Sequence, residues 1–344
     1  MSAPGDSRRL VAPGLLAVLE RFPETELNDA NLTSWRMAAR AMAAPLISPL
    51  GQAVHRAERF IPGPSGAPDV RVLIYTPPAK DSALRPAYLQ LHGGGFVMGA
   101  PEMNDGANRA LAAGLDCIIL SVDYRLAPET RFPGAVEDAY AALLWLHAAS
   151  EPLGVDAARI AIGGQSAGAG HAAALALRAR DRGEVSICLQ MLDSPMIDDR
   201  TGSTAEPHPY CGEFAWTPAK NRFGWRALLG AEPGGVETPA EAAPARVADL
   251  SKLPPAFIVV GALDLFLEEN IEYARRLIRA GVPTELHVIP GAFHGFTSVG
   301  GESPEVTLAL SLRRAALARA FAHAGSSRSY SADARHGPLG QVQR

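Results

Sequence analysis

The sequence has few cysteines and no long apolar run, and both absences narrow the class of protein to which it can belong. Its three cysteines, Cys117, Cys188 and Cys211, lack the close spacing of a metal site. An odd number without a framework of pairs suits a reducing compartment. No run approaches the roughly 20 apolar residues that a membrane-spanning helix needs. We therefore expect a cytoplasmic protein with no metal site and no membrane partner.

An excess of positive charge is also absent. The formal net charge is −4, so the chain carries no basic footprint for a nucleic-acid partner. Arg8 and Arg9 precede a mostly apolar stretch over residues 10–19, as in a signal peptide. Pro13 and Gly14 interrupt that stretch, and no small-residue cleavage site follows it, so we expect no cleaved signal.

Apolar runs typical of strands alternate with helical patterns along most of the chain, without an internal repeat. The predicted strands cover residues 54–61, 70–75, 87–91, 117–122, 160–162, 185–192, 256–260 and 284–289. The predicted helices cover residues 102–114, 134–149, 169–180, 268–280 and 306–322. Such alternation predicts an α/β fold, in which helices cover both faces of a mostly parallel, eight-stranded sheet.

Two segments break this alternation. Residues 1–50 form an arm with helical patterning ahead of the first strand. Residues 199–235 are polar, rich in proline and glycine, and too long for a plain loop, and such insertions are usually lids or binding loops. We assign residues 51–324 to the main domain. The arm at residues 1–50 could serve packing alone or could cover an active site. The polar tail, residues 325–344, is expected to be mobile.

The most informative stretch ends the strand at residues 160–162 with Gly164-Gln165-Ser166-Ala167-Gly168. An alanine-rich helical segment follows at once. A serine between such a strand and helix is typical of a nucleophile elbow, a strained turn that bulky neighbours would block. Glycine and serine are common, so the pattern alone would also fit an ordinary strand-to-helix connection. The context favours the elbow.

A second signal, His92-Gly93-Gly94-Gly95-Phe96, follows the strand at residues 87–91. Consecutive glycines let backbone N–H groups approach a reacting oxygen without interference from side chains. In lipases and esterases, this type of loop supplies one arm of the oxyanion hole. The alternative is a flexible glycine loop. We expect His92 to anchor the loop rather than to act as a base.

The order of the residues that follow Ser166 supports nucleophilic catalysis. Asp264 comes just after the strand at residues 256–260, and His294 comes just after the strand at residues 284–289. α/β-Hydrolases place their triad in the order serine, acid, histidine. Ser166 would then attack a carbonyl carbon, His294 would transfer the proton, and Asp264 would fix the histidine tautomer.

Other acids and histidines lie near these positions and compete for the same roles. The competing acids are Asp193, Asp198, Asp199, Glu268 and Glu269, and the competing histidines are His171 and His287. The two glutamates begin a predicted helix, where a negative charge suits the helix dipole. A histidine within a helix or a strand is ordinarily a packing residue. We therefore favour Asp264 and His294.

These motifs, in this order, resemble the hormone-sensitive-lipase family of α/β-hydrolases, the bacterial family IV esterases. The matching stretches are His92-Gly93-Gly94-Gly95-Phe96, Asp123-Tyr124-Arg125-Leu126-Ala127-Pro128-Glu129, Gly164-Gln165-Ser166-Ala167-Gly168, Asp264, and His294-Gly295-Phe296. One departure is Gln165, since the family usually has an acid, or sometimes threonine, before the serine. The serine, the glycines and Ala167 are intact, so the departure affects pH optimum and local hydrogen bonding rather than catalysis.

The resemblance implies the α/β-hydrolase fold and a serine carboxylesterase that needs no cofactor and no metal. It implies an oxyanion hole formed by the N–H groups of Gly94, Gly95 and Ala167. It also implies a cap made from the arm and the insertion. Members of this family often form homodimers through the last strand, here residues 284–289, and we expect this chain to do the same.

We expect the substrate to be a small ester with a short to medium acyl chain, held in an apolar pocket. The residues expected to line that pocket are Phe96, Phe214, Trp216, Leu265 and Phe296. Hydrolysis of a lactone or an amide is an alternative. A binding protein on the same fold, like the plant gibberellin receptors that lack the catalytic histidine, is disfavoured by His294. Carbon–halogen and epoxide hydrolysis on this fold need an aspartate nucleophile, which Ser166 excludes.

Overall fold

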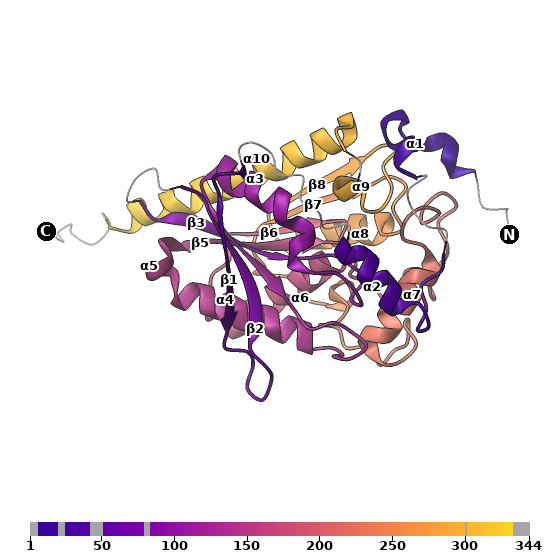
Figure 1. Cartoon of the computed structure of the whole chain (residues 1–344), viewed down its shortest axis with the longest axis horizontal. Coiled ribbons are helices and arrows are strands. Elements are labelled where there is room, and N and C mark those ends of the chain that lie inside the picture. The colour runs from indigo at the N-terminus through magenta and orange to yellow at the C-terminus, as the bar shows by residue number, and fades with distance from the viewer. Residues whose placement is uncertain (1–5, 20–24, 42–50, 79–82, 300, 333–344) are drawn as a thin grey trace, which may run out of the picture.

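The computed structural model describes residues 6–19, 25–41, 51–78, 83–299 and 301–332 (Figure 1). Within them, eight strands form one sheet in the order β1-β2-β4-β3-β5-β6-β7-β8. The strands are β1 His55–Ile61, β2 Val70–Thr76, β3 Arg85–Leu91, β4 Ile118–Asp123, β5 Val155–Gln165, β6 Leu189–Asp193, β7 Ala256–Gly261 and β8 Thr284–Ile289. β2 pairs antiparallel with β1 and β4, and the other neighbours are parallel. The predicted α/β fold with a mostly parallel, eight-stranded sheet is confirmed.

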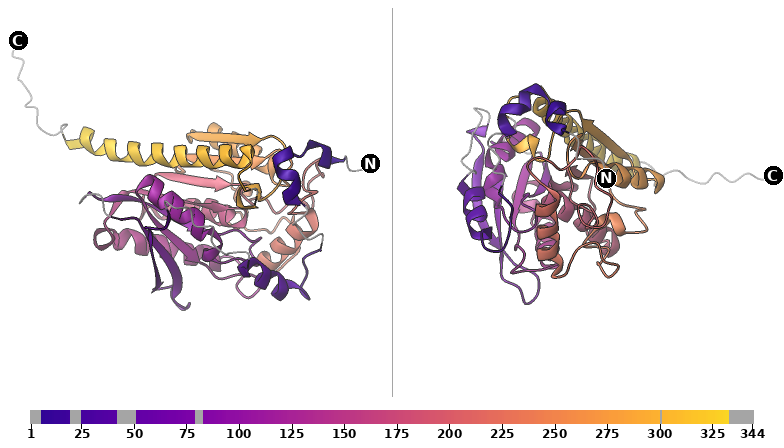
Figure 2. Two further views of the ribbon diagram at one scale, coloured as in Figure 1. Left: turned by 45° about the horizontal axis from the view of Figure 1, so that its top comes forward. Right: turned by 90° about the vertical axis from the view of Figure 1, so that its right-hand side faces the viewer.

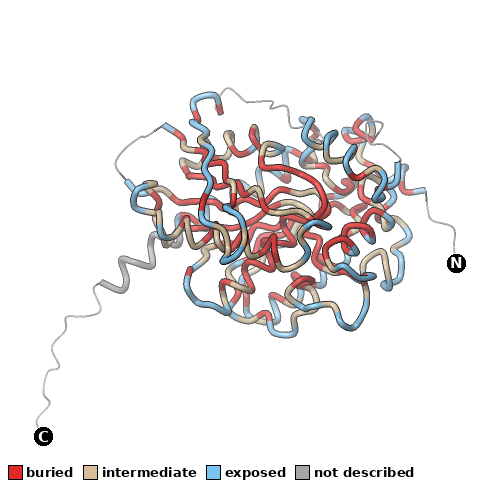
Figure 3. The backbone as a smooth tube through the Cα atoms, turned by 60° about the horizontal axis from the view of Figure 1, so that its bottom comes forward, coloured by how far each residue is buried: buried red, intermediate tan, exposed pale blue. Residues whose placement is uncertain are grey.

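Helices cover both faces of the sheet, as Figures 1 and 2 show. The helices on one face are α4 Gly134–Ala148, α6 Ala167–Arg182 and α8 Leu267–Arg279, and those on the other are α1 Pro13–Leu19, α3 Asp105–Leu115 and α10 Pro304–Ala332. Neighbouring residues of a strand join opposite layers: in β3, Leu89 packs in the first layer and Tyr88 in the second. This burial on both faces explains why the central strands are continuously apolar. Figure 3 shows buried residues gathered in the centre of the molecule, with exposed residues around them.

A third apolar cluster forms the cap, beyond the carboxyl ends of the parallel strands. It joins α2 Leu32–Ala41 with α7 Pro218–Leu229, which lies in the segment between β6 and β7. Trp225 is completely buried there and packs against Phe96 of the glycine loop, with ring centroids 4.9 Å apart. The cap is therefore packed directly on the loop that follows β3.

Several boundaries differ from the sequence-based expectations. Of the arm at residues 1–50, α2 packs in the cap, whereas α1 packs on the sheet face beside α10. The segment between β6 and β7 runs to Pro255, well beyond residue 235. The strand predicted at residues 185–192 begins only at Leu189. Val185 is also buried, but it lies in the loop before the strand. Apolar character alone does not distinguish a buried loop residue from a buried strand residue.

The last helix extends beyond its predicted end at residue 322. α10 continues to Ala332, so it includes the first part of the tail at residues 325–344. The remainder of that tail, residues 333–344, lies outside the described residues, as do residues 1–5, 20–24 and 42–50 of the arm. Over the parts of the chain that the structure describes, no helix combines the length and the apolar character that a bilayer crossing requires.

Candidate active site

Ser166 lies in the sharp turn between β5 and α6, with φ 55° and ψ −122°. This positive φ is unfavourable for a residue with a side chain. The flanking glycines are required by close packing. A Cβ on Gly164 would lie 2.4 Å from the carbonyl oxygen of Leu91, and a Cβ on Gly168 would lie 2.3 Å from that of His92. The turn predicted around Ser166 therefore has the geometry of a nucleophile elbow.

The structure brings Ser166, His294 and Asp264 together, although they follow three different strands. His294 Nε2 lies 2.9 Å from Ser166 Oγ, and His294 Nδ1 lies 2.9 Å from Asp264 Oδ2. Asp264 is completely buried, and its Oδ1 accepts a hydrogen bond of 2.9 Å from the N–H of Phe266. The ring of Phe266 contacts the imidazole of His294 with centroids 4.9 Å apart. The imidazole is therefore held between a carboxylate and a hydroxyl, and His294 is only 7% exposed.

The glycine loop passes beside Ser166 in a conformation that suits glycine. Gly94 has φ 129° and Gly95 has φ 58°. A Cβ on Gly95 would lie 2.1 Å from the Trp216 ring, so the cap leaves no room for a side chain there. Ala167 is the first residue of α6, and its N–H therefore has no acceptor within that helix. The loop and the helix start are the two places where oxyanion donors are expected.

His92 is buried below this loop. Its Nδ1 lies 2.9 Å from the carbonyl oxygen of Gly93, and its ring stacks on Tyr124 with centroids 4.2 Å apart. The hydroxyl of Tyr124 donates to the carbonyl oxygen of His92 at 2.6 Å. Burial lowers the pKa of His92, so the ring stays neutral. These contacts agree with an anchoring role.

The five residues expected to line a pocket differ in their surroundings. Trp216 lies beside the site, with its ring centroid 6.3 Å from that of His294, and Leu265 is partly exposed. Phe214 is also partly exposed and packs edge-on against Phe293. Phe96 is 2% exposed and Phe296 is fully buried, so both contact protein rather than face an open pocket.

The competing acids and histidines have other partners. Asp199 accepts hydrogen bonds from Arg246, Thr238 and the N–H of Gly234, within the segment between β6 and β7. Glu269 is buried on α8, where burial raises its pKa. Their neighbours Asp198, which is partly buried, and Glu268, which is exposed, line one surface pocket.

His171 and His287 also contact residues other than Ser166. Burial lowers the pKa of His171 to about 3, and its ring packs 4.8 Å from that of Phe96. His287 Nε2 lies 2.6 Å from a carboxylate oxygen of Glu285 on β8. Gln165 is partly exposed, and its Oε1 accepts a hydrogen bond of 3.5 Å from Ser298.

Phe266, which directly follows Leu265, was also expected to flank the catalytic loops, and it contacts His294. Three other residues around the site had no sequence signal. Thr297 and Arg313 bind Asp193, and Arg36 of α2 binds the carbonyl oxygens of residues 97 and 127. Each contact joins positions that are distant in the chain or belong to no short motif. Among the described residues, no group of histidines, cysteines and acids could hold a metal ion.

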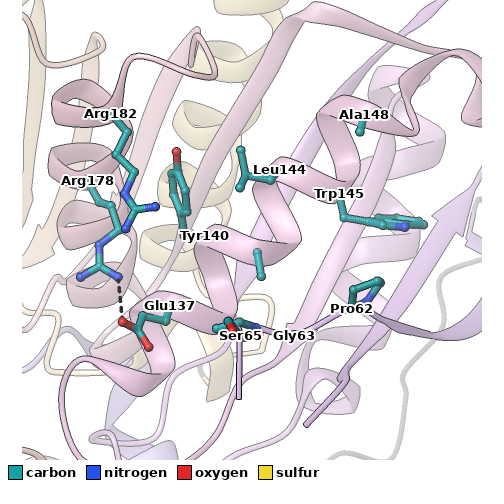
Figure 4. A pocket seen from close by; sticks show the side chains of 12 residues that line it. Pro62, Gly63, Ser65, Glu137, Tyr140, Leu144, Trp145, Ala148, Arg178 and Arg182 are labelled. Carbon is teal, nitrogen blue, oxygen red and sulfur yellow. Dashed lines mark ion pairs between the residues drawn. The ribbon is translucent and has the colours of Figure 1, made fainter. Parts of the chain in front are cut away.

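A pocket of about 620 Å³ lies elsewhere, beside the turn between β1 and β2 (Figure 4). It is lined by α4 residues such as Tyr140 and Trp145, and by Arg178 of α6, whose guanidinium lies 3.9 Å from Glu137. None of the residues described above around Ser166 lines it.

Comparisons with known proteins agree with this arrangement. A family profile described as the alpha/beta hydrolase fold matches residues 88–298. Esterase LipI of Mycobacterium tuberculosis is 37% identical over 305 residues, covering 88% of this chain and 92% of that protein. Carboxylesterase NlhH of the same organism is 34% identical over 329 residues, covering 93% and 99%. The solved structure of a bacterial heroin esterase matches with a TM-score of 0.84 and 36% identity, covering 92% and 99% of the two chains.

Proposed function

This chain belongs to the α/β-hydrolase fold family, as a carboxylic ester hydrolase of its hormone-sensitive-lipase branch, and on that premise we propose that Ser166, His294 and Asp264 form its catalytic triad. The observation that carries the proposal is the continuous chain of contacts from Asp264 through His294 to Ser166, with 2.9 Å at each step.

The reaction proceeds through an acyl-enzyme. Ser166 Oγ attacks the ester carbonyl carbon as its proton moves to His294 Nε2. The imidazolium, paired with Asp264, then gives this proton to the departing alcohol oxygen, and the acyl group remains on Ser166. A water molecule repeats the sequence: its proton moves to His294, its oxygen forms the carboxylic acid, and Ser166 regains its proton.

The negative charge that develops on the carbonyl oxygen needs donors already in place. We propose the N–H groups of Gly94, Gly95 and Ala167 for this role. Their positions beside Ser166 support it, as does the N-terminus of α6, which directs its partial positive charge at the same point. Fixed donors of this kind cost no reorganisation as the reaction proceeds.

Replacement of the nucleophile tests the function. Ser166→Ala should lower kcat for p-nitrophenyl butyrate at least about a thousandfold, because loss of a triad member typically costs several powers of ten. The control is Ser311→Ala, an exposed serine on α10, which should match the wild type. The triad assignment fails if Ser166→Ala keeps more than about one hundredth of the wild-type kcat.

We further propose that the substrates carry short to medium acyl chains. Trp216, packed against Gly95 and near His294, supports a confined space over Ser166. Each buried methylene adds about 0.8 kcal/mol of binding until that space is full, and further methylenes strain the packing. With p-nitrophenyl esters of increasing length, kcat/KM should therefore peak at roughly two to eight carbons. A rise continuing past about twelve carbons would contradict this picture.

Hydrolysis of a lactone or an amide remains an alternative on the same triad. A panel of matched esters, lactones and amides would separate these activities by kcat/KM. Esters should be the preferred class, because Esterase LipI and Carboxylesterase NlhH are named for ester hydrolysis.

A homodimer through β8 and a cytoplasmic location are also proposals. β8 has β7 as its single neighbour in the described sheet, and such an edge can pair with a second copy. Sedimentation at micromolar concentration should give twice the mass of the chain, and a monomer would exclude the dimer. The cytoplasmic location rests on three cysteines that form no disulfide.

A further inference from the structure

Asp193 is a second buried carboxylate close to the proposed triad, and the reaction above does not use it. It ends β6, which lies between the strand that leads to Ser166 and the strand that leads to Asp264. Its backbone carbonyl oxygen accepts a hydrogen bond of 2.8 Å from the N–H of Ser166. Asp193 therefore holds the main chain of the strained elbow directly.

The side chain of Asp193 points to the other half of the site. Its Oδ2 accepts a hydrogen bond of 2.9 Å from the hydroxyl of Thr297, which follows His294 by three residues. Thr297 lies on α9 Phe296–Val299, the short helix that continues the histidine loop. The same oxygen accepts a hydrogen bond of 3.1 Å from Arg313 Nη1 on α10. One residue thus binds the nucleophile's turn through its carbonyl and the histidine's loop through its carboxylate.

Arg313 compensates the charge of the buried Asp193 carboxylate. The carboxylate is 3% exposed, and burial raises its pKa, while Arg313 and His294 oppose that rise and Asp264 adds to it. On β3, Tyr88 also faces Arg313. An isolated buried carboxylate would be costly, and a cation with hydrogen bonds offsets that cost.

We propose that Asp193 is a positioning residue of the ester hydrolysis: it sets the spacing between Ser166 and His294 by holding the elbow and the histidine loop at once, with Arg313 neutralising its charge. The proposal rests on the triad proposed above. Its role differs from that of Asp264, which binds the imidazole ring itself. Misplacement of reacting groups by about 1 Å can cost about a hundredfold in rate.

The sharpest test removes one hydroxyl. Thr297→Val keeps the shape of the side chain but breaks the link between Asp193 and the histidine loop. We expect kcat to fall about tenfold with KM nearly unchanged, because the loss acts on alignment rather than on substrate binding. Thr297→Ser restores the hydroxyl and should restore most of the rate.

A charge cycle tests the Arg313 part. Asp193→Asn leaves the Arg313 cation facing an amide near His294, which disfavours the imidazolium. The acid limb of kcat/KM should therefore move to lower pH, and kcat should fall. Arg313→Met removes the cation that opposes the rise in the pKa of Asp193, so Asp193 should take up its proton at a higher pH and the acid limb should move to higher pH. In the double variant, Asp193→Asn with Arg313→Met, the limb should return toward its wild-type position, because neither charge remains.

Asp105 supplies a matched control. It is a buried acid on α3, paired with Arg56 and Arg109 at 2.8 Å each. Asp105→Asn should lower the urea midpoint of unfolding about as much as Asp193→Asn, while kcat and the pH profile stay unchanged. The proposal is overturned if Thr297→Val and Asp193→Asn lower stability but leave kcat and the pH profile at their wild-type values, as expected for Asp105→Asn.

Ser166→Ala in the same series distinguishes the two proposals. If that variant is inactive and the Asp193 and Thr297 variants keep wild-type kcat and pH profiles, the positioning role alone is wrong. If Ser166→Ala stays active, the triad itself is wrong. Thr297→Val and Thr297→Ser carry the test even if Asp193→Asn does not fold.

Discussion

The carboxyl edge of the sheet and the cap above it hold their residues by different means. At the edge, the main chain does most of the positioning. Ser166 has a strained φ, the neighbouring backbone leaves no room for a Cβ at Gly164 or Gly168, and backbone hydrogen bonds hold the elbow in place. In the cap, long side chains join distant segments. Arg36 on α2 donates to the carbonyl oxygen of Val97 at 2.7 Å and forms an ion pair with Glu129.

Other cap contacts follow the same rule. Arg246 and Thr238 meet at the buried carboxylate of Asp199, and the ammonium of Lys220 on α7 lies 5.2 Å from the ring centroid of Trp35 on α2. A main-chain constraint tolerates few residue types, whereas a side-chain contact can be exchanged for another of similar strength. The edge should therefore govern the chemical step and the cap should govern substrate binding.

The largest effect expected at the edge comes from the histidine and its acid. His294→Ala and Asp264→Asn should each lower kcat by about 10³ to 10⁴, and the double variant should be little worse than either, because triad members act as a unit. Steady-state kinetics with a butyrate ester measures this. A far larger loss in an Asp193 or Asp199 variant than in Asp264→Asn would mean that the acid is misassigned.

A smaller effect, on the free energy of unfolding, is expected below the edge, where His171 packs between Phe96 and Tyr124. Burial lowers its pKa to about 3, whereas in the unfolded chain it is about 6.5. Between these values the unfolded state binds more protons, so stability falls as the pH falls. From pH 7 to pH 5 the loss should be about 2 kcal/mol, measured by urea unfolding.

His171→Leu removes this titration and should flatten the decline between pH 7 and pH 5. Leu175→Ala, at a buried position of the same helix that does not titrate, is the control: it should lower stability without flattening the decline. An equally steep decline in His171→Leu would show that the buried ring is not its source. His92, whose pKa is lowered by burial too, contributes in the same direction.

The smallest effect is expected in the cap. Arg36→Ala removes the contacts of α2 with Val97 and Glu129, and KM should rise about tenfold with kcat within about threefold. The Arg36 guanidinium lowers the pKa of Glu129 to about 2, so the pair persists at mildly acid pH. Glu129→Gln keeps the bond from Arg36 to Val97 and should have a weaker effect. If kcat falls in Arg36→Ala by the same factor as KM rises, the cap also affects the chemical step, and the inferred division between edge and cap is wrong.

The same division explains what could be predicted from the sequence. The glycines at 164 and 168 and the triple glycine after β3 are demanded by close backbone approach, so they form short, visible motifs. The order of Ser166, Asp264 and His294 follows from the strand order. The resulting fold and family were predicted correctly.

What the sequence could not reveal depends on contacts between distant side chains. The bond from Arg36 to Val97 joins positions 61 residues apart, and no local pattern marks it. The split of the arm into α1 on the sheet face and α2 in the cap was missed. The sequence of α1 is uniformly apolar and that of α2 is amphipathic, and neither pattern indicates which surface the helix packs against. Phe96 and Phe296 were expected in a pocket, but an aromatic beside a catalytic loop fits the core equally well.

The ion pair of Asp193 and Arg313 has a consequence for synthesis on the ribosome. The two residues lie 120 positions apart, and β6 therefore leaves the exit tunnel long before α10. Until Arg313 emerges, closing the sheet around Asp193 would bury a carboxylate without its cation, at a cost of several kcal/mol. We expect the nascent chain to keep this edge open, so that the serine becomes reactive only when almost the whole protein has been made.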